Sequence, residues 1–237
     1  MAAGRTLLTL ASALVAGFAG AALFAWSGLG AGASGEGTRE YLLANPEVLP
    51  EAMELLQQRE TLARIAPLRS QLEAPFPGAV LGNPQGSVTL VEFSDYACGY
   101  CRSSLPDVQR LIAANPDLKV VVREYPILTP ESADAARMAL AAAQQGRYAA
   151  FHDAMFAAGQ PTPETIEAAA RQAGLDLEQA RGAIASGVFD GQLQGNMALA
   201  QQLGVSGTPS WVVGEQALNG AVGFERMGQA IADARSS

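Results

Sequence analysis

The chain has 237 residues, of which 49% are hydrophobic, 16% charged and 6% aromatic, and this composition excludes a disordered or collagen-like protein. Fifteen basic and 23 acidic residues give a formal net charge of −8, which disfavours binding to nucleic acid or to an anionic membrane by bulk electrostatics. One histidine and two cysteines exclude a metal site built within this chain from several His and Cys ligands, because even catalytic zinc sites need three protein ligands.

The first 33 residues are predicted to be an export signal. Arg5 supplies the positive flank, residues 7–26 carry no charge, and Ala31-Gly32-Ala33 offers a small-residue cleavage site. The apolar run, about 20 residues long, is also sufficient to cross a bilayer, so an uncleaved anchor formed by residues 7–26 is the alternative. In either case we expect the rest of the chain in the periplasm or another extracytoplasmic compartment, where conditions are oxidising.

Residues 34–74 are predicted to be an N-terminal helical segment. A helix from about Pro50 to Leu72 fits, since proline suits the first helical position. Two interpretations stay open: an amphipathic helix packed on its own domain, or an oligomerisation stalk, whose seam Gln58 and Arg69 would interrupt. The apolar residues at helical spacing are Leu55, Leu62, Ile65, Leu68 and Leu72.

A different pattern begins after a Pro- and Gly-containing boundary at 74–78. Residues 88–93 form an apolar, β-branched run that predicts a buried strand. The run leads into Cys98-Gly99-Tyr100-Cys101, and apolar residues at helical spacing then continue to Asn115-Pro116, where the predicted helix ends. Residues 119–124 predict a second buried strand.

The rest of the chain is predicted to be mainly helical, with a final pair of strands. An Ala-rich stretch from Pro130 to about Leu203 indicates several helices, broken by glycines and by the Pro161-Thr-Pro163 turn. Two short strands across Gly214 and a C-terminal helix over residues 224–234 follow. The predicted segments after residue 74 are therefore 75–128, the all-helical 129–204, and 205–237.

The two cysteines are the centre of the predicted chemistry. Their spacing puts them at i and i+3 in the first turn of a helix, close enough for an intramolecular disulfide. Free N–H groups and the macrodipole at a helix N-terminus favour a thiolate, so we expect Cys98 to be the nucleophile and Cys101 to resolve the mixed disulfide. No cofactor is expected beyond this redox-active pair.

These residues also have other interpretations. A structural disulfide between Cys98 and Cys101 would close a very small loop and add little stability, and a zinc site shared between subunits would need ligands from a second chain. His152 is expected to be a surface or helix-packing residue rather than a catalytic base, because thiol exchange needs no external histidine. Tyr100, between the cysteines, is either a surface aromatic or a modulator of thiolate stability and substrate contact; we favour the modulator.

The strand at 88–93, the Cys98-Gly99-Tyr100-Cys101 motif, the helical insertion and Gly207-Thr208-Pro209-Ser210 together resemble the DsbA-family thiol-disulfide oxidoreductases of the bacterial cell envelope. The resemblance covers about residues 79–235. It implies an α/β thioredoxin-like fold with an inserted all-helical domain, preceded here by the N-terminal helical segment.

The resemblance also implies roles for single residues. Pro209 would be a cis-proline facing the two sulfurs, and Thr208 would lie beside Cys98 and offer its backbone to an extended substrate segment. Glu92 matches the position of a buried acid that helps to move a proton to or from Cys101; the plain alternative is a strand residue facing solvent. The substrates would be proteins with thiols or disulfides, and nucleic acid is not expected as a partner.

Gly99 and Tyr100 depart from the Pro-His dipeptide of the strong oxidase. Without an imidazolium there, we expect a less oxidising couple, and Gly-Tyr together with Thr208 is similar to the disulfide isomerases. Residues 41–49, continuing into Arg59-Glu60, resemble the N-terminal region of suppressor of copper sensitivity protein C-like members, in which a comparable region can oligomerise the protein. We therefore expect an isomerase or reductase kept reduced by a DsbD-like membrane partner, and a homo-oligomer formed through the N-terminal segment is an open alternative to a monomer.

Two alternatives to this function stay open. One is a dithiol oxidase kept oxidised by a DsbB-like membrane partner, which would use the same residues at a different redox poise. The other is a holdase or a copper-handling module in which Cys98 and Cys101 bind Cu(I) as a thiolate pair.

Overall fold

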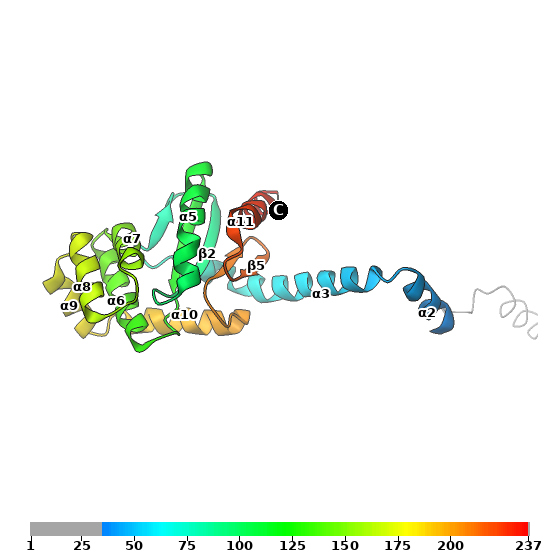
Figure 1. Ribbon diagram of the computed structural model, residues 1–237, viewed down its shortest axis with the longest axis horizontal. Coiled ribbons are helices and arrows are strands. Elements are labelled where there is room, and N and C mark those ends of the chain that lie inside the picture. Colours follow the sequence, from blue (N-terminus) through cyan, green and yellow to red (C-terminus); the bar gives the residue numbers. More distant parts are fainter. Residues whose placement is uncertain (1–34, 237) are drawn as a thin grey trace, which may run out of the picture. The chain divides into compact units, whose positions relative to one another are not determined.

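The computed structural model describes residues 35–236, and the predicted export signal or anchor lies outside them. The described residues contain a five-stranded sheet in the order β1-β3-β2-β4-β5, in which β2 and β3 are parallel and the other neighbours antiparallel (Figure 1). This is the expected α/β thioredoxin-like arrangement, with helices inserted between β3 and β4. The strands are β1 (Val80–Gly82), β2 (Val88–Ser94), β3 (Leu118–Glu124), β4 (Ser210–Val213) and β5 (Gln216–Asn219).

Both faces of the sheet are covered by other parts of the chain. For this reason the sequences of β2 and β3 are nearly continuous runs of apolar residues. All seven residues of β2 are buried. Leu90, Val120 and Trp211 face a core shared with α5 (Gly99–Ala114), α11 (Gly223–Ala234) and the first inserted helices. The opposite face, with Phe93 and Val121, packs in a second core under the residues Ile65, Leu68, Leu72, Leu199 and Leu203.

The predicted helical block consists of five helices, four of which gather at one end of the sheet in Figure 1. Glycines interrupt the block as expected, since Gly174 and Gly187 have φ angles of +75° and +73°, which favour glycine. Thr129 and Thr162 cap two of the helices with reciprocal side-chain hydrogen bonds. The helices are α6 (Pro130–Gln144), α7 (Tyr148–Ala158), α8 (Pro163–Gln172), α9 (Leu177–Ala185) and α10 (Asp190–Leu203).

The prediction of one helix from about Pro50 to Leu72 is correct at its start within two residues and wrong at its end. Helix α3 spans Val48–Ile65, and a 3-10 turn (η1, Ala66–Leu68) separates it from α4 (Arg69–Glu73). Pro67 causes the break, because it has no N–H to donate to the preceding turn. Ile65, Leu68 and Leu72 pack on their own domain, whereas Leu55 is 47% exposed.

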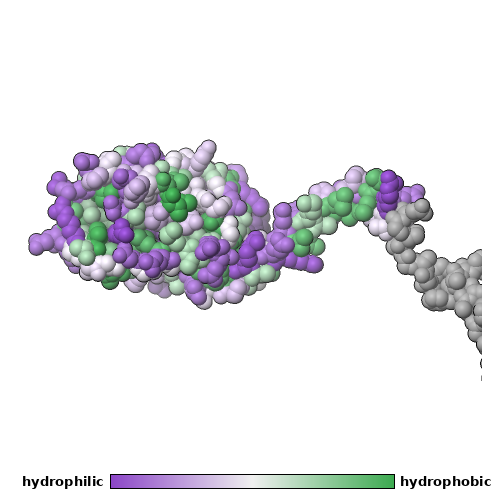
Figure 2. Space-filling model, turned by 90° about the horizontal axis from the view of Figure 1, so that it is seen from below, coloured by the Kyte–Doolittle hydropathy of each residue, from purple (hydrophilic) through white to green (hydrophobic). Residues whose placement is uncertain are grey.

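The described chain divides into two units between Leu56 and Gln57, and the first unit is largely helical and exposed. It contains α2 (Gly35–Ala44) and the first part of α3. Figure 2 shows hydrophobic surface along this unit. The large exposed apolar side chains there are Tyr41, Leu43, Leu49, Met53, Leu55 and Leu56.

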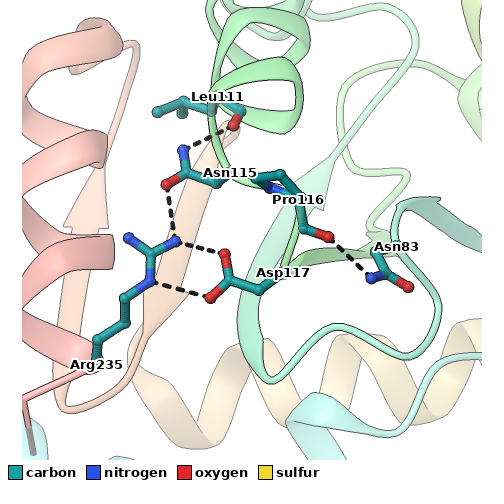
Figure 3. Close-up of polar contacts among 6 residues, drawn as sticks. All are labelled: Asn83, Leu111, Asn115, Pro116, Asp117 and Arg235. Carbon is teal, nitrogen blue, oxygen red and sulfur yellow. Dashed lines mark hydrogen bonds and ion pairs between the residues drawn. The ribbon is translucent and has the colours of Figure 1, made fainter.

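At the N-terminal end of β3, polar contacts join the last helix to the sheet (Figure 3). The Arg235 guanidinium donates to both Asp117 oxygens, at 2.7 and 3.1 Å, and to Asn115 Oδ1 at 2.8 Å. Asn83 Nδ2 donates to the Pro116 carbonyl at 2.8 Å. Because β2 and β3 are parallel, these contacts lie at the end of the sheet opposite to the cysteines, which follow the C-terminal end of β2.

Candidate functional site

The two cysteines occupy the first turn of α5, as the sequence predicts. Cys98 is the N-cap residue of this helix, and the Cys101 backbone N–H donates to its Sγ at 3.3 Å. A backbone donor and the positive end of a helix dipole both favour negative charge on this sulfur. Both cysteines are free thiols in this structure.

Cys101 lies deeper than the N-cap sulfur and is 1% exposed. Burial, together with the charge of the nearby Glu92 carboxyl, raises the pKa of the Cys101 thiol. Cys101 therefore holds its proton strongly, and a group that can take this proton is needed before Cys101 can attack a disulfide.

Thr208 lies beside the N-cap sulfur, as the resemblance implies, and Pro209 follows it directly. The Cys98 thiol donates to the Thr208 carbonyl at 3.2 Å, across 110 residues of sequence. The predicted cis peptide bond between Thr208 and Pro209 is present. The two residues between the cysteines are exposed, unlike the cysteines themselves. Gly99 is the first residue of α5, and the Tyr100 side chain is 70% exposed.

Glu92 is buried in the middle of β2, so the alternative of a solvent-facing strand residue is wrong. Its side chain is 2% exposed, and its backbone pairs with Val122 on one side and Trp211 on the other. Burial raises the pKa of Glu92 to about 7. A carboxyl with this pKa can exchange a proton near neutral pH, which is the property required beside Cys101.

Asp95 shapes the turn between β2 and α5, a role that the sequence analysis did not identify. Its Oδ1 accepts from the Ala97 N–H at 2.8 Å, and its Oδ2 accepts from the N–H groups of Ile127 and Leu128 at 2.8 and 2.9 Å. An Asp that directly follows a strand is the available sequence signal, because Asx turns use this residue. These bonds fix the segment immediately before Cys98.

A second buried acid, Glu124, lies at the end of β3 and was also missed. Its Oε1 accepts from the Tyr148 hydroxyl at 2.8 Å and from the Tyr96 hydroxyl at 3.3 Å. The Tyr96 hydroxyl is also 3.2 Å from His152 Nδ1. Burial raises the pKa of Glu124 to about 8 and lowers that of His152 to about 4, so His152 is neutral and packs inside the helical insertion, one of its two expected placements.

The loop between α7 and α8 is held against both ends of the cysteine motif. Arg102, directly after Cys101, donates to the Gly159 carbonyl at 2.6 Å. Gln160 Nε2 donates to the Ala97 carbonyl at 3.4 Å. The inserted helices thus contribute to the wall around the cysteines as well as to the core.

Comparison with known families gives two matches. Residues 89–232 match the family described as the DSBA-like thioredoxin domain. Residues 38–61 match the copper resistance protein ScsC N-terminal domain. The first match covers the sheet from β2, the cysteine motif and the inserted helices, and the second covers part of the N-terminal helical segment.

Curated relatives and solved structures are consistent with these matches. A Na(+)/H(+) antiporter NhaA 3 from Salinispora tropica is 30% identical over 161 residues, which are 67% of this chain and 25% of that protein. The chain thus spans about a quarter of the length of the curated relatives it matches.

Three solved structures extend the comparison. A thioredoxin-like oxidoreductase from Silicibacter pomeroyi is 44% identical, with a TM-score of 0.64, and covers 67% of this chain and 92% of its own. The thiol-disulfide exchange protein alpha-DsbA2 from Wolbachia pipientis is 26% identical, with a TM-score of 0.68 and coverage of 75% and 97%. A periplasmic thioredoxin-like protein from Salmonella enterica serovar Typhimurium is 25% identical, with a TM-score of 0.62 and coverage of 72% and 97%.

Proposed function

The chain belongs to the family of DsbA-like thioredoxin domains, and from this premise we propose that it is a thiol-disulfide oxidoreductase that acts on disulfides of cell-envelope proteins through Cys98. The observation that carries the proposal is the position of the Cys98 sulfur. It caps α5, 3.3 Å from the Cys101 N–H, and lies 3.2 Å from the Thr208 carbonyl. A sulfur placed in this way is suited to attack a disulfide whose chain lies along Thr208 and Pro209.

The reaction is a sequence of thiolate displacements. The Cys98 thiolate attacks one sulfur of a substrate disulfide, forms a mixed disulfide, and releases the other substrate sulfur as a thiolate. In isomerisation this thiolate attacks another substrate disulfide. A substrate thiolate then attacks the substrate sulfur bound to Cys98, forms a new substrate disulfide and releases Cys98, so no net electrons are transferred. In reduction Cys101 gives up its proton and attacks the Cys98 sulfur, and the enzyme pair loses two electrons to the substrate.

Glu92 is the group that takes and returns the Cys101 proton in this proposal. It is buried next to that thiol, and its pKa of about 7 keeps both of its protonation states accessible near neutral pH. Tyr100 and Gly99 line the exposed side of the motif, where the 70% exposed Tyr100 ring is available to a substrate chain.

Isomerase or reductase activity is the preferred direction. The Gly99-Tyr100 dipeptide supplies no imidazolium to stabilise the Cys98 thiolate, which favours a less oxidising couple. The exposed apolar side chains of α2 and early α3 offer a surface for a second copy of the chain, and a cleft between catalytic domains would suit a misfolded substrate. A DsbD-like membrane donor would keep the pair reduced; a DsbB-like acceptor belongs to the oxidase alternative.

The site of action in this proposal is the periplasm or another extracytoplasmic space. The sequence pattern of residues 1–33 supports export, and a similar solved structure is that of a periplasmic protein. Within residues 35–236, no helix combines the length and apolar character that a membrane crossing requires. An anchor over residues 7–26 would place the catalytic unit in the same compartment.

The direction of the reaction is tested by recovery of activity from a protein substrate with scrambled disulfides in a glutathione buffer. Recovery that requires Cys98 and is lost in Cys98→Ser supports the isomerase. Rapid oxidation of a reduced substrate without recovery from the scrambled one would establish the oxidase instead. Cys98→Ser with full activity in both assays would overturn the proposal.

A copper-handling role is the second candidate, favoured by the match of residues 38–61 to the copper resistance protein ScsC N-terminal domain. Cys98 and Cys101 would provide two thiolates, which suit Cu(I). Titration of the reduced protein with Cu(I) tests it directly. Stoichiometric binding that Cys98→Ser abolishes would support it, and weak or non-stoichiometric binding would exclude it.

A further inference from the structure

Two carboxyl groups, rather than one, are buried on the face of the sheet that packs against α5. Glu92 on β2 is paired in register with Val122 on β3, and Ser94 is paired with Glu124. Residues two apart on a strand point to the same face, so Glu92 and Glu124 are diagonal neighbours on the face that packs against α5. Both side chains are almost completely buried, with exposures of 2% and 1%.

The hydrogen bonds of Glu124 connect three parts of the molecule. The Tyr96 hydroxyl, from the turn two residues before Cys98, donates to Oε1 at 3.3 Å. The Tyr148 hydroxyl, from the first turn of α7, donates to the same oxygen at 2.8 Å. His152 continues the chain from Tyr96 at 3.2 Å, and an edge-to-face contact with Phe151 and a tilted ring contact with Phe156 enclose the Tyr96 ring.

The ionisable groups around Glu124 do not neutralise a charge on it. Glu92 and Asp95 on the β2 side are acidic, Tyr96 and Tyr148 are neutral donors, and His152 is neutral. The adjacent Arg123 instead donates to the carbonyls of Leu72 and Ala74, on the opposite side of the sheet. Within residues 35–236, no ion pair to Glu92 or Glu124 is formed.

A buried carboxyl without a counter-charge is costly when ionised, and a glutamine could accept the same two tyrosine hydroxyls without that cost. Packing and hydrogen bonding alone therefore do not account for an acid at position 124. A second carboxyl beside Glu92 provides what an amide cannot, which is a second group that can hold a proton next to Glu92.

We propose that Glu124 shares with Glu92 the proton left over when the Cys98–Cys101 disulfide is reduced, and that Tyr96, Tyr148 and His152 hold Glu124 in position for this role. The inference rests on the proposed function, because it requires the two cysteines to cycle between disulfide and dithiol. Glu124 is a positioning residue for the proton, since it touches neither sulfur.

A dithiol protein donor supplies two electrons and two protons to the Cys98–Cys101 disulfide and becomes a disulfide itself. One proton stays on Cys101, Cys98 becomes a thiolate, and the second proton passes to the carboxylates of Glu92 and Glu124. When the enzyme pair is oxidised again by a substrate disulfide, the carboxyls release that proton as the thiolate charge disappears.

The electrostatics support this balance. Burial raises the pKa of Glu92 to about 7 and that of Glu124 to about 8, so both groups change protonation within the working range of an envelope enzyme. A thiolate formed on Cys98 adds negative charge nearby, which raises the proton affinity of the carboxyls further. Because each carboxyl repels the charge of the other, the two titrate as a pair.

The test is the infrared difference spectrum between the reduced and oxidised protein near neutral pH. The carbonyl band of a protonated carboxyl is expected to grow on reduction. Glu124→Gln, which keeps the shape and can accept both tyrosine hydroxyls, is expected to lose the Glu124 part of that band. Glu178→Gln, which removes an exposed acid from α9, is the matched control and should retain the whole band.

A second variant keeps the proposal testable if Glu124→Gln does not fold. Tyr148→Phe removes a hydrogen bond that favours the charged form of Glu124, so the pH midpoint of the carboxyl band should rise by about one pH unit. A band unchanged in Glu124→Gln, or an unshifted midpoint in Tyr148→Phe, overturns the inference. If disulfide exchange still depends on Cys98 in that case, the proposed function stands without it; exchange that survives Cys98→Ser would overturn the function first.

Discussion

Replacing Glu92 with glutamine should change how the stability of the protein depends on pH. In the folded protein burial raises the pKa of Glu92 from 4.5 to about 7, whereas the unfolded chain keeps the ordinary value. Between these two values the folded state binds more protons than the unfolded state, so the free energy of unfolding falls as pH rises through this window. A glutamine at position 92 has no such dependence.

The size of the effect follows from the width of the window. A separation of about 2.5 pH units corresponds to about 3 kcal/mol at 1.36 kcal/mol per unit. Because Glu92 is buried, screening by solvent does not reduce this free-energy difference substantially. Relative to the native protein, Glu92→Gln should therefore gain about 3 kcal/mol of stability between about pH 4 and pH 8.5, where native Glu92 is forced to ionise.

The assay is urea unfolding of the oxidised protein at several pH values, because the disulfide removes the titration of Cys101 from the measurement. Glu124→Gln is introduced into both proteins, so that the carboxyl that titrates together with Glu92 does not enter the difference. Glu178→Gln, which removes an exposed acid from α9, serves as the matched control. A Glu92→Gln difference that stays constant across the range would show that Glu92 is not a buried acid with a raised pKa.

Three further substitutions test packing and polar contacts outside the cysteine site. Arg123→Met leaves the carbonyls of Leu72 and Ala74 without their buried donor and should cost about 3–5 kcal/mol in urea unfolding; a loss below about 1 kcal/mol would contradict the role given to Arg123. Gly86→Ala places a Cβ 2.4 Å from the Asp117 carbonyl oxygen and should lower the thermal midpoint through a loss of about 1–3 kcal/mol, and an unchanged midpoint would refute the close approach. Arg235→Ala breaks an exposed ion pair with Asp117, so its midpoint should equal that of the native protein within error, and a large drop would mean that the pair is worth more than exposed pairs usually are.

Much of the fold could be predicted because the residue patterns that indicate its strands and helices lie within those same segments of the sequence. The runs of Val and other apolar residues at 88–93 and 119–124 mark β2 and β3, since strands buried on both faces have few polar residues. The cysteine motif follows the first run directly, which places it at the start of α5. Glycines and the Pro161-Thr-Pro163 turn separate the inserted helices where the sequence indicates.

Other elements carry too little local signal. Strand β1 has three residues and is defined only by its pairing with β3, which lies some forty residues further along the chain. Pro67 was overlooked because the apolar stripe continues past it, although a proline inside a helix removes a hydrogen bond.

The polar part of the site depends on contacts that no local pattern shows. Glu124 meets Tyr148 and Tyr96 across 24 and 28 residues, and Tyr96 meets His152 across 56. An acidic residue at the end of a strand predicts that the chain becomes exposed to solvent there. Position 124 is buried only because the inserted helices pack over it. Glu92 could be singled out only by resemblance, because a single acid in an apolar strand does not reveal which face it lies on.

The central claim, that Cys98 is the attacking sulfur, is tested most directly by trapping the mixed disulfide. Cys101→Ser cannot resolve the intermediate, so on incubation with a disulfide-containing protein it should accumulate a covalent adduct through Cys98 that a reductant removes. Cys98→Ser should form none under the same conditions, because Cys101 is buried and holds its proton strongly. Adducts formed by Cys98→Ser and absent from Cys101→Ser would contradict the assignment of the nucleophile and the mechanism built on it.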